Sequence, residues 1–204
     1  ARNLVQPGDM LIAADGGTRH ILAMNLSPAV IIGDFDSMPD GFLEKMQSTP
    51  PVLIHHPRDK EETDLELALA YALKQGFAPI TIIAALGGRL DQTIGNLSLL
   101  TGAEFVGKDI RLDDGVEEVF FTRQQAEWQG NPGDLVSLLP WGEPAGGVSS
   151  VGLKWPLHDE ILKPDKTRGI SNEMLGTTAS VQIKSGLILI IHTRLSLVQN
   201  AHMR

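Results

Sequence analysis

The chain has 204 residues, 42% of them hydrophobic and 21% charged, a composition typical of globular proteins with one large or two small domains. Its 17 basic and 25 acidic residues give a net charge of −8, which argues against a broad nucleic-acid-binding surface. It contains no cysteine, which excludes disulfides, thiolate zinc sites and a cysteine nucleophile.

Nothing in the sequence indicates a membrane protein. The longest apolar run near the C-terminus covers residues 187–191 and is far shorter than the roughly 20 residues of a membrane span. The first ten residues lack the apolar core of a signal peptide. We therefore expect a cytoplasmic protein with no membrane partner.

Short apolar runs alternate with helix-like segments in the first half of the chain. The runs do not alternate between polar and apolar residues, so they predict strands buried on both faces of a parallel sheet. They cover residues 10–14, 29–32, 52–54 and 80–86.

Two helices are predicted in the same half. Residues 63–75 carry an apolar stripe that ends before Gly76, and Thr63 with Glu66 has the spacing of a capping box. Residues 91–101 form the second helix. Strands that alternate with helices predict an α/β domain with right-handed crossovers.

The pattern changes after about residue 108. Short apolar runs are separated there by Gly, Pro, Asn and Asp, without helical periodicity, which predicts an antiparallel sandwich or barrel. Residues 181–183 and 187–191 flank a Lys-Ser-Gly turn and predict a hairpin. We expect an α/β domain with a parallel sheet over residues 1–110, followed by an all-β antiparallel, sandwich-like domain over residues 111–204.

Aspartates follow the predicted strands with unusual regularity. Ligands of a parallel α/β sheet bind where strands end, so these acids are expected to gather at one edge. Like charges packed together are costly without a cation, and Mg²⁺ prefers carboxylate oxygens combined with substrate phosphates. The sequence therefore predicts a site for Mg²⁺ and a polyphosphate, built from Asp15, Asp34, Asp36, Asp64 and Asp91.

Other nucleotide and metal motifs are missing. The chain has neither the P-loop pattern G-x-x-x-x-G-K-[ST] nor the dinucleotide pattern G-x-G-x-x-G. Gly87 and Gly88 precede a predicted helix, where bare backbone amides suit a phosphate. His55 and His56 are adjacent and face opposite sides of a strand, which disfavours a zinc pair.

Each candidate also has a purely structural interpretation. Asp15 before two glycines suits an Asx-turn, and Asp64 suits the positive end of a helix dipole. Arg89 fits a surface charge and the two glycines before it fit a tight turn. Trp155 fits a core or interface aromatic as well as a platform for a flat heteroaromatic ring.

Taken together, these motifs resemble the thiamine pyrophosphokinase family. The matching segments follow one another in order from about residue 10 to residue 193. They are residues 14–17, 33–37, 60–66, 87–92, 96–97, 136–140, 152–157 and 171–173.

The resemblance implies an enzyme that transfers the pyrophosphoryl group of ATP to the hydroxyl of thiamine, giving thiamine diphosphate and AMP. It implies Mg²⁺ as cofactor, ATP as co-substrate, and a homodimer whose active sites lie between subunits. The second domain would bind thiamine and form the dimer. We expect in-line attack by the thiamine hydroxyl on the β-phosphorus, with a carboxylate accepting its proton; Asp64 is the first candidate, and Asp36 and Asp91 stay open as alternatives.

The resemblance also assigns the site residues. The metal ligands would be Asp34, Asp36 and Asp64, with Asp91 and Arg89 as further catalytic residues. Nucleotide binding is implied for Asp15, Gly16, Gly17, Lys60, Gly87, Gly88 and Asn96. Thiamine binding is implied for Trp155, which would stack on the pyrimidine, and for Ser171 and Asn172.

Two departures from the family pattern stand out. Glu61 occupies a position where the family usually has Asp, and a leading strand with an Asn-Gly turn is expected to be missing before residue 10. Three alternatives stay open: a pyrophosphokinase for a hydroxymethylpterin-type alcohol, a Mg²⁺-dependent phosphohydrolase with Asp34 as nucleophile, and a non-catalytic thiamine-binding module.

Overall fold

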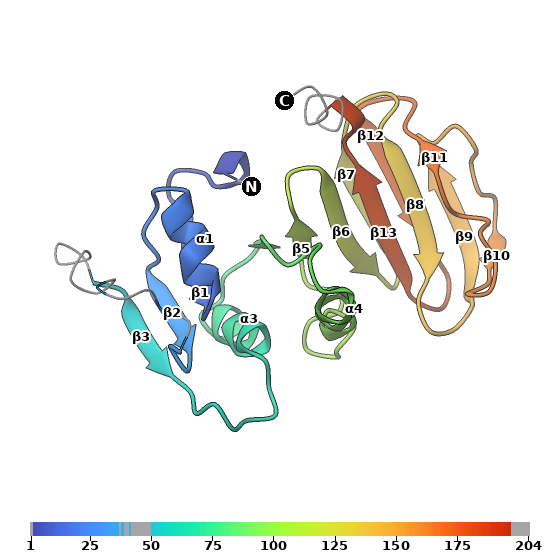
Figure 1. The fold of residues 1–204 in the computed structure, drawn as a ribbon. Coiled ribbons are helices and arrows are strands. Elements are labelled where there is room, and N and C mark those ends of the chain that lie inside the picture. The colour runs from blue at the N-terminus through green and yellow to red at the C-terminus, as the bar shows by residue number, and fades with distance from the viewer. Residues whose placement is uncertain (1, 37, 39–40, 42–49, 197–204) are drawn as a thin grey trace. The chain divides into compact units, whose positions relative to one another are not determined.

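The computed structural model describes residues 2–36, 38, 41 and 50–196. Two compact units make up the chain, Ala1–Ile80 and Thr81–Arg204 (Figure 1). They divide upstream of the boundary near residue 110 that the sequence predicts, and that boundary stays a prediction. No helix among the described residues is long and apolar enough to cross a membrane.

The first unit is an α/β layer structure around a three-stranded parallel sheet in the order β1-β2-β3. One face of the sheet packs against α1 and the other against α3 (Figure 1). In chain order its elements are η1 (Arg2–Leu4), β1 (Ile12–Ala14), α1 (Gly17–Ala23), β2 (Val30–Gly33), β3 (Val52–His55) and α3 (Asp64–Lys74).

Residues of β1 and β2 supply both faces of the sheet. Ala13 and Ile31 pack with Ile21 of α1, while Val30 and Ile32 pack with Ala68 of α3. Every residue of β2 is therefore buried, as its continuous apolar run predicts. The same expectation is wrong for β3, three of whose four residues are exposed, because β3 lies at the edge of the sheet.

Helix α3 begins where the sequence predicts. The Thr63 side chain accepts a hydrogen bond from the backbone N–H of Glu66 at 3.2 Å, which satisfies one of the free donors of the first turn. The helix ends at Lys74, and Gly76 takes a φ of 80° just after it. The cap fixes the position of Asp64, the first residue of the helix.

The second unit contains two β-sheets, which confirms the predicted sandwich-like architecture. A four-stranded sheet has the order β10-β9-β12-β7 and a six-stranded sheet the order β11-β8-β13-β6-β5-β4. β4 (Ile80–Ile82) begins at the last residue of the first unit. The other elements are α4 (Leu90–Leu99), β5 (Ile110–Asp113), β6 (Glu117–Thr122), β7 (Gln125–Gln129), β8 (Leu135–Pro140), β9 (Ala145–Val151), β10 (Glu160–Leu162), β11 (Asn172–Glu173), β12 (Thr178–Gln182) and β13 (Ile188–Thr193).

Side chains from both sheets form the core of this unit. Trp128 and Val181 of the four-stranded sheet belong to the same buried cluster as Leu138, Ile188 and Ile190 of the six-stranded sheet. The inward residues alternate with exposed or half-buried ones along strands such as β7, β9 and β12. The apolar runs of the second half thus predict the strands that pack face to face.

Two details of the sequence prediction are wrong. The run 80–86 was expected in the parallel sheet, but β4 ends at Ile82 and lies beside β5 in the six-stranded sheet. Ala84 takes a φ of 60°, so the extended backbone cannot continue through the run.

The predicted hairpin over residues 184–186 is also absent. β12 pairs with β7 and β9, whereas β13 pairs with β6 and β8, so the turn connects the two sheets. The backbone of Lys184 and Ser185 bonds to Gly146 at the start of β9 instead of closing on itself. These long-range bonds take the place of hairpin pairing.

A buried ionic network crosses the six-stranded sheet. His192 of β13 is fully buried, with Nδ1 3.3 Å from Glu118 Oε2 and Nε2 3.1 Å from Asp134 Oδ2. Arg194 donates two hydrogen bonds to Asp113, of 2.9 and 2.8 Å, and lies 3.4 Å from Glu118. We call these residues, together with Arg111, the sandwich ion network.

Glu118 is the centre of the network. Burial alone would raise the pKa of Glu118, but hydrogen bonds from His192 and Arg111 and the charges of Arg111 and Arg194 hold this pKa below its ordinary value. Arg111 approaches Glu118 Oε1 to 2.7 Å, and its guanidinium lies over the Phe120 ring. The network therefore stabilises the ionised form of a carboxylate that burial would otherwise disfavour.

Candidate functional site

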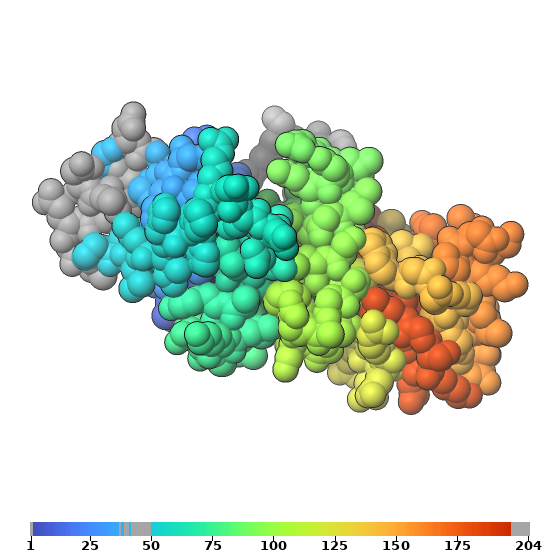
Figure 2. Space-filling view, turned by 90° about the horizontal axis from the view of Figure 1, so that it is seen from below, coloured from blue at the N-terminus to red at the C-terminus, as the bar shows by residue number. Residues whose placement is uncertain are grey.

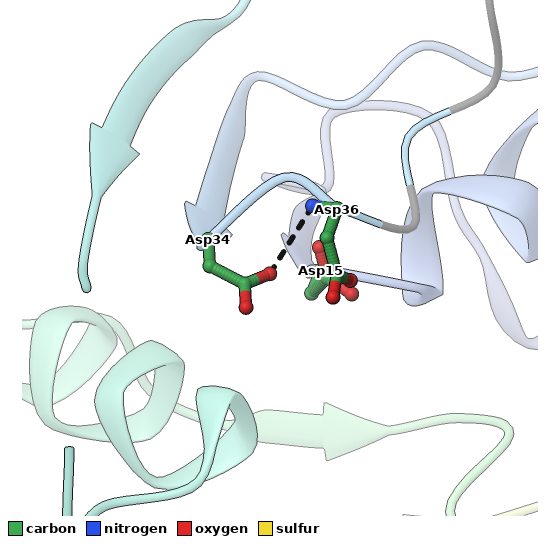
Figure 3. A group of neighbouring side chains, drawn as sticks. All are labelled: Asp15, Asp34 and Asp36. Carbon is green, nitrogen blue, oxygen red and sulfur yellow. Dashed lines mark hydrogen bonds between the residues drawn. The ribbon is translucent and has the colours of Figure 1, made fainter. Parts of the chain in front are cut away.

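Three aspartates meet at the carboxyl ends of β1 and β2. Asp15 follows β1, and Asp34 and Asp36 follow β2. Each offers a carboxylate oxygen, and the three oxygens lie within 4.8 Å of one another (Figure 3). We call these three residues the acidic trio; their meeting is what the strand-end rule predicts for parallel strands.

The backbone of the trio is held in an uncommon conformation. Asp15 and Phe35 both take positive φ, 33° and 65°. Gly33 takes a φ of 152°, and a Cβ there would lie 2.8 Å from the Asp15 Cβ, so only glycine fits. Asp34 Oδ1 accepts a hydrogen bond from the backbone N–H of Asp36 at 3.1 Å.

The side chain of Phe35 anchors this turn. It packs against the cluster of Ala13, Ile21 and Ile31 and makes an edge contact with the His55 ring, with centroids 5.5 Å apart. In an extended Asp-x-Asp segment the two carboxylates would point to one side of the strand because side chains alternate. The structure instead brings them together through the left-handed turn at Phe35.

The trio suits a divalent cation. Asp15 Oδ1 is buried and has no hydrogen-bond partner among the described residues, although a buried carboxylate oxygen normally has one. Arg58 approaches Asp36 Oδ2 to 3.6 Å, but three negative charges share the site. Carboxylate oxygens are ligands that suit Mg²⁺, which usually takes one or two of them together with substrate phosphates and water.

Asp64 lies close to Gly33, as Asp15 of the trio does. A Cβ on Gly33 would be 3.2 Å from Asp64 Oδ1 and 2.8 Å from the Asp15 Cβ. Lys60 Nζ is 3.0 Å from the same Asp64 oxygen, which is buried and accepts no hydrogen bond from the residues that the structure describes. Lys60 itself donates to the Pro57 carbonyl.

The sequence predicted Asp34, Asp36 and Asp64 as the metal ligands, whereas the structure groups Asp15 with the first two. The contact of Arg58 with Asp36 was not predicted. Its position just after the third apolar run, at the same edge of the sheet, is the signal that points to it. Ser37, quoted in the family motif, lies outside the described residues.

Gly16 and Gly17 follow Asp15 directly. Gly16 occupies the N-cap position of α1 and Gly17 is the first residue of that helix. They bring the chain from β1 into α1 immediately after the first acid of the trio.

The glycine loop before α4 belongs to the second unit. Gly87 and Gly88 take φ values of 79° and 70°. Two side chains of helix α4 donate hydrogen bonds to the backbone of the loop. Thr93 Oγ1 donates to the Gly87 carbonyl at 3.1 Å, and Asn96 Nδ2 donates to the Ala85 carbonyl at 3.0 Å. The predicted nucleotide residue Asn96 therefore shapes the loop through its side-chain amide.

Arg89 and Asp91 pair with each other at the start of α4. Arg89 Nε donates to Asp91 Oδ1 at 3.1 Å, and both side chains are largely exposed. The hydrogen bond from Arg89 lowers the pKa of Asp91. These two predicted residues have their charges matched, whereas Asp15 Oδ1 of the trio has no hydrogen-bond partner among the described residues.

Trp155 is held on the surface of the second unit. It is 48% exposed, which excludes the core position that its structural interpretation offered. Asn172 is buried and grips its backbone: Oδ1 accepts from the Trp155 N–H at 3.0 Å and Nδ2 donates to the Trp155 carbonyl at 2.7 Å. Ser171 N donates to Ser137 Oγ at 3.2 Å.

Comparison with known proteins covers both units. The catalytic-domain model of thiamin pyrophosphokinase matches residues 1–112, and the vitamin B1 binding-domain model of thiamin pyrophosphokinase matches residues 122–188. The thiamine pyrophosphokinase of Bacillus subtilis is 28% identical over 184 residues, which cover 89% of this chain and 86% of the relative. The thiamin pyrophosphokinase 1 of Caenorhabditis elegans is 28% identical over 217 residues, 96% of this chain and 83% of the relative.

Solved structures agree with these matches. The crystal structure of thiamine pyrophosphokinase from Bacillus subtilis is similar with a TM-score of 0.82 and 25% identity, over 94% of this chain and 91% of that one. A thiamin pyrophosphokinase family protein from Enterococcus faecalis is similar with a TM-score of 0.81 and 27% identity, over 93% and 92% of the two chains.

Proposed function

Because the chain belongs to the thiamine pyrophosphokinase family and transfers the pyrophosphoryl group of ATP to thiamine, we propose that its acidic trio binds the Mg²⁺ that accompanies ATP. The observation that carries this proposal is the buried, unpartnered Asp15 Oδ1 within a group of three converging carboxylates. When bound there, Mg²⁺ would neutralise phosphate charge as the pyrophosphoryl group is transferred.

Asp64 is proposed to accept the proton of the thiamine hydroxyl. Its Oδ1 accepts no hydrogen bond from the described residues and forms an ion pair with Lys60, whose Nζ lies 3.0 Å away. The hydroxyl oxygen bonds to the β-phosphorus of ATP, the bond to the bridging oxygen breaks, and AMP leaves with that oxygen. The sequence predicts a different role for Asp64, that of a metal ligand. A metal-binding measurement on an Asp64 variant distinguishes the two roles.

The remaining roles follow the family motifs. We propose that the nucleotide is bound or positioned by Lys60, Gly16, Gly17, the loop of Gly87 and Gly88, Arg89, Asp91 and Asn96. Trp155 is proposed to stack on the thiamine pyrimidine beside Ser171 and Asn172, and its exposed, backbone-clamped position supports this role. Most of the electrostatic stabilisation of the transition state would come from fixed charges opposite in sign to those of the phosphates.

A homodimer is also proposed, as the family resemblance implies. The segment from residue 150 to 175 lies together on the surface of the second unit (orange in Figure 2). Val151, Ile161 and Leu175 in this segment are 70%, 64% and 63% exposed, so their apolar side chains are accessible to a partner. Sedimentation analysis tests the dimer. The cytoplasmic location stays a prediction from the sequence.

The direct test is incubation of the protein with ATP, Mg²⁺ and thiamine. We expect AMP and thiamine diphosphate in equal amounts. AMP formation with a hydroxymethylpterin but not with thiamine would indicate the other pyrophosphokinase. Phosphate release from monoesters with a trapped acyl-phosphate would indicate the hydrolase, and thiamine binding without AMP would indicate a binding module.

A further inference from the structure

Lys154 covers one face of the exposed Trp155 ring. Its Nζ lies 4.8 Å from the ring centroid, within the range of a cation–π interaction. The ammonium is held in place by Glu173, whose Oε2 is 2.7 Å away. The surface that is proposed to bind thiamine therefore already carries a cation on its aromatic platform.

The pair rests on a rigid frame. Lys154 N donates to the Glu173 carbonyl at 2.9 Å, and Leu153 forms a β-bridge with Met174. Leu153 and Met174 are each 2% exposed, so the frame is anchored in the core of the sandwich. Together with the grip of Asn172 on the Trp155 backbone, these contacts fix where the ring and the ammonium lie.

Thiamine offers two flat rings to such a platform. Its aminopyrimidine is neutral above mildly acidic pH, whereas its thiazolium ring carries a permanent positive charge. A bare tryptophan face attracts cations because of the negative potential of its π-system, so it would favour the thiazolium. Only one of the two rings can stack on Trp155, because the hydroxyethyl arm on the thiazolium ring has to reach the nucleotide.

Lys154 reverses that preference. A second cation stacked on the same indole would lie within roughly 10 Å of the ammonium and be repelled by the part of its charge that Glu173 does not offset. The ammonium also occupies the negative potential that a cationic ligand would use. A neutral ring loses little by either effect.

We propose that Lys154, held by Glu173, is a specificity-determining residue that makes Trp155 select the neutral aminopyrimidine of thiamine and reject the thiazolium. This inference rests on the proposed binding of thiamine at Trp155. It adds a residue whose charge, rather than its contact area, sets the orientation of the substrate.

The test uses the full chain and the two halves of thiamine as separate probes. The probes are 4-amino-5-hydroxymethyl-2-methylpyrimidine and the N-methylated 5-hydroxyethyl-4-methylthiazolium. Their dissociation constants are measured at pH 8 from the quenching of tryptophan emission. A Trp155→Phe variant identifies the part of the signal that comes from Trp155 rather than from Trp128 and Trp141.

We expect the pyrimidine to bind more tightly to the unmodified chain. Lys154→Met should raise the affinity for the thiazolium about threefold, the size of one exposed and partly screened charge contact, and change the affinity for the pyrimidine less than about twofold. Lys154→Arg keeps the charge and should keep the original ratio. Lys184→Met, which removes an exposed lysine of the same unit paired with Asp159, should also keep it.

An unchanged ratio in Lys154→Met would overturn the proposal, as would an Arg variant that behaves like the Met variant, since the effect would then come from shape. If neither half alters Trp155 emission while ATP, Mg²⁺ and thiamine still yield AMP, the stacking role of Trp155 and this inference fail together and the enzymatic function stands. Absence of AMP with normal pyrimidine binding would instead contradict the proposed function alone.

Discussion

The molecule uses clustered carboxylates in two opposite ways. In the sandwich ion network every acid is matched: Asp113 receives two hydrogen bonds from Arg194, and Asp134 accepts from the backbone of Asn131 and Leu195 and contacts His192. In the acidic trio Asp15 Oδ1 is buried with no hydrogen-bond partner among the described residues. Matched acids stabilise the fold, and the unmatched oxygen indicates a place for a ligand.

The backbone conformations of the two regions also differ. Asp15 and Phe35 in the site have positive φ, whereas none of the acids and arginines of the network has a positive φ. Such strain costs on the order of 1–3 kcal/mol per residue and persists where the surrounding structure enforces it. Here the packing of Phe35 and the close approach of Gly33 enforce it.

The largest expected effect is the loss of catalysis in Asp36→Asn. Removing one carboxylate of the trio should lower kcat/KM for AMP formation by at least about 100-fold, the usual size of a lost electrostatic contact at a transferring group. The melting temperature should change little, because like charges in the trio are relieved. Asp165→Asn, which removes an exposed acid beside Lys166, is the control and should retain turnover.

The matched acids should respond in the opposite manner. Arg194→Met leaves Asp113 as a buried charge without its bidentate partner and should lower the free energy of unfolding by about 2–4 kcal/mol. Urea titration measures this loss. Activity per folded molecule should be retained, and a loss of turnover that exceeds the loss of folded protein would show that the two regions are not separate in function.

Gly33→Ala tests the close approach in the site. Its Cβ would meet the Asp15 Cβ at 2.8 Å, so we expect a destabilisation of about 1–3 kcal/mol together with weaker metal binding. Gly76→Ala is matched in having positive φ, 80°, but its Cβ would meet nothing within 4 Å. It should cost about 1 kcal/mol and leave metal binding intact. Equal metal binding in both variants would contradict the role of Gly33.

Acid should weaken the network through Glu118. The folded state holds the pKa of Glu118 below its ordinary value of 4.5, so its contribution is present above that pH and is lost as the pH falls through the lowered pKa. The stability difference between the unmodified chain and Glu118→Gln should therefore shrink from pH 7 toward acid. Glu127→Gln, at an exposed position of β7, should show no such trend in urea unfolding.

The smallest effect is expected at the exposed pair of Lys184 and Asp159. Although Nζ and Oδ1 are 2.7 Å apart, the side chains are 73% and 65% exposed. Lys184→Met should change the free energy of unfolding by less than about 0.5 kcal/mol. A loss of unfolding free energy as large as that in Arg194→Met would mean that burial does not determine how much these ion pairs contribute to stability.

The difference between the two regions also explains what could be predicted from the sequence. Asp15, Asp34 and Asp36 each follow an apolar run directly, so a local pattern and the geometry of parallel strands suffice to gather them. The capped start of α3 places Asp64 in the same way. The left-handed turn at Phe35 has no such local signal, because bulky residues rarely adopt that conformation.

The network could not be predicted because its partners are far apart in the chain. His192 is separated by 58 residues from Asp134 and by 74 from Glu118, and Arg194 by 81 from Asp113. Pairing of β13 with both β6 and β8 creates these contacts. The hairpin prediction failed for the same reason, since strand partners are chosen by packing across the sandwich rather than by the turn.

Titration with Mn²⁺, followed by the loss of the free-ion paramagnetic resonance signal, tests the central claim that the trio of Asp15, Asp34 and Asp36 binds the metal. We predict that Asp15→Asn weakens Mn²⁺ binding at least about tenfold while Asp64→Asn changes it less than about threefold. Retained affinity in Asp15→Asn, or an equal loss in Asp64→Asn, would contradict the assignment.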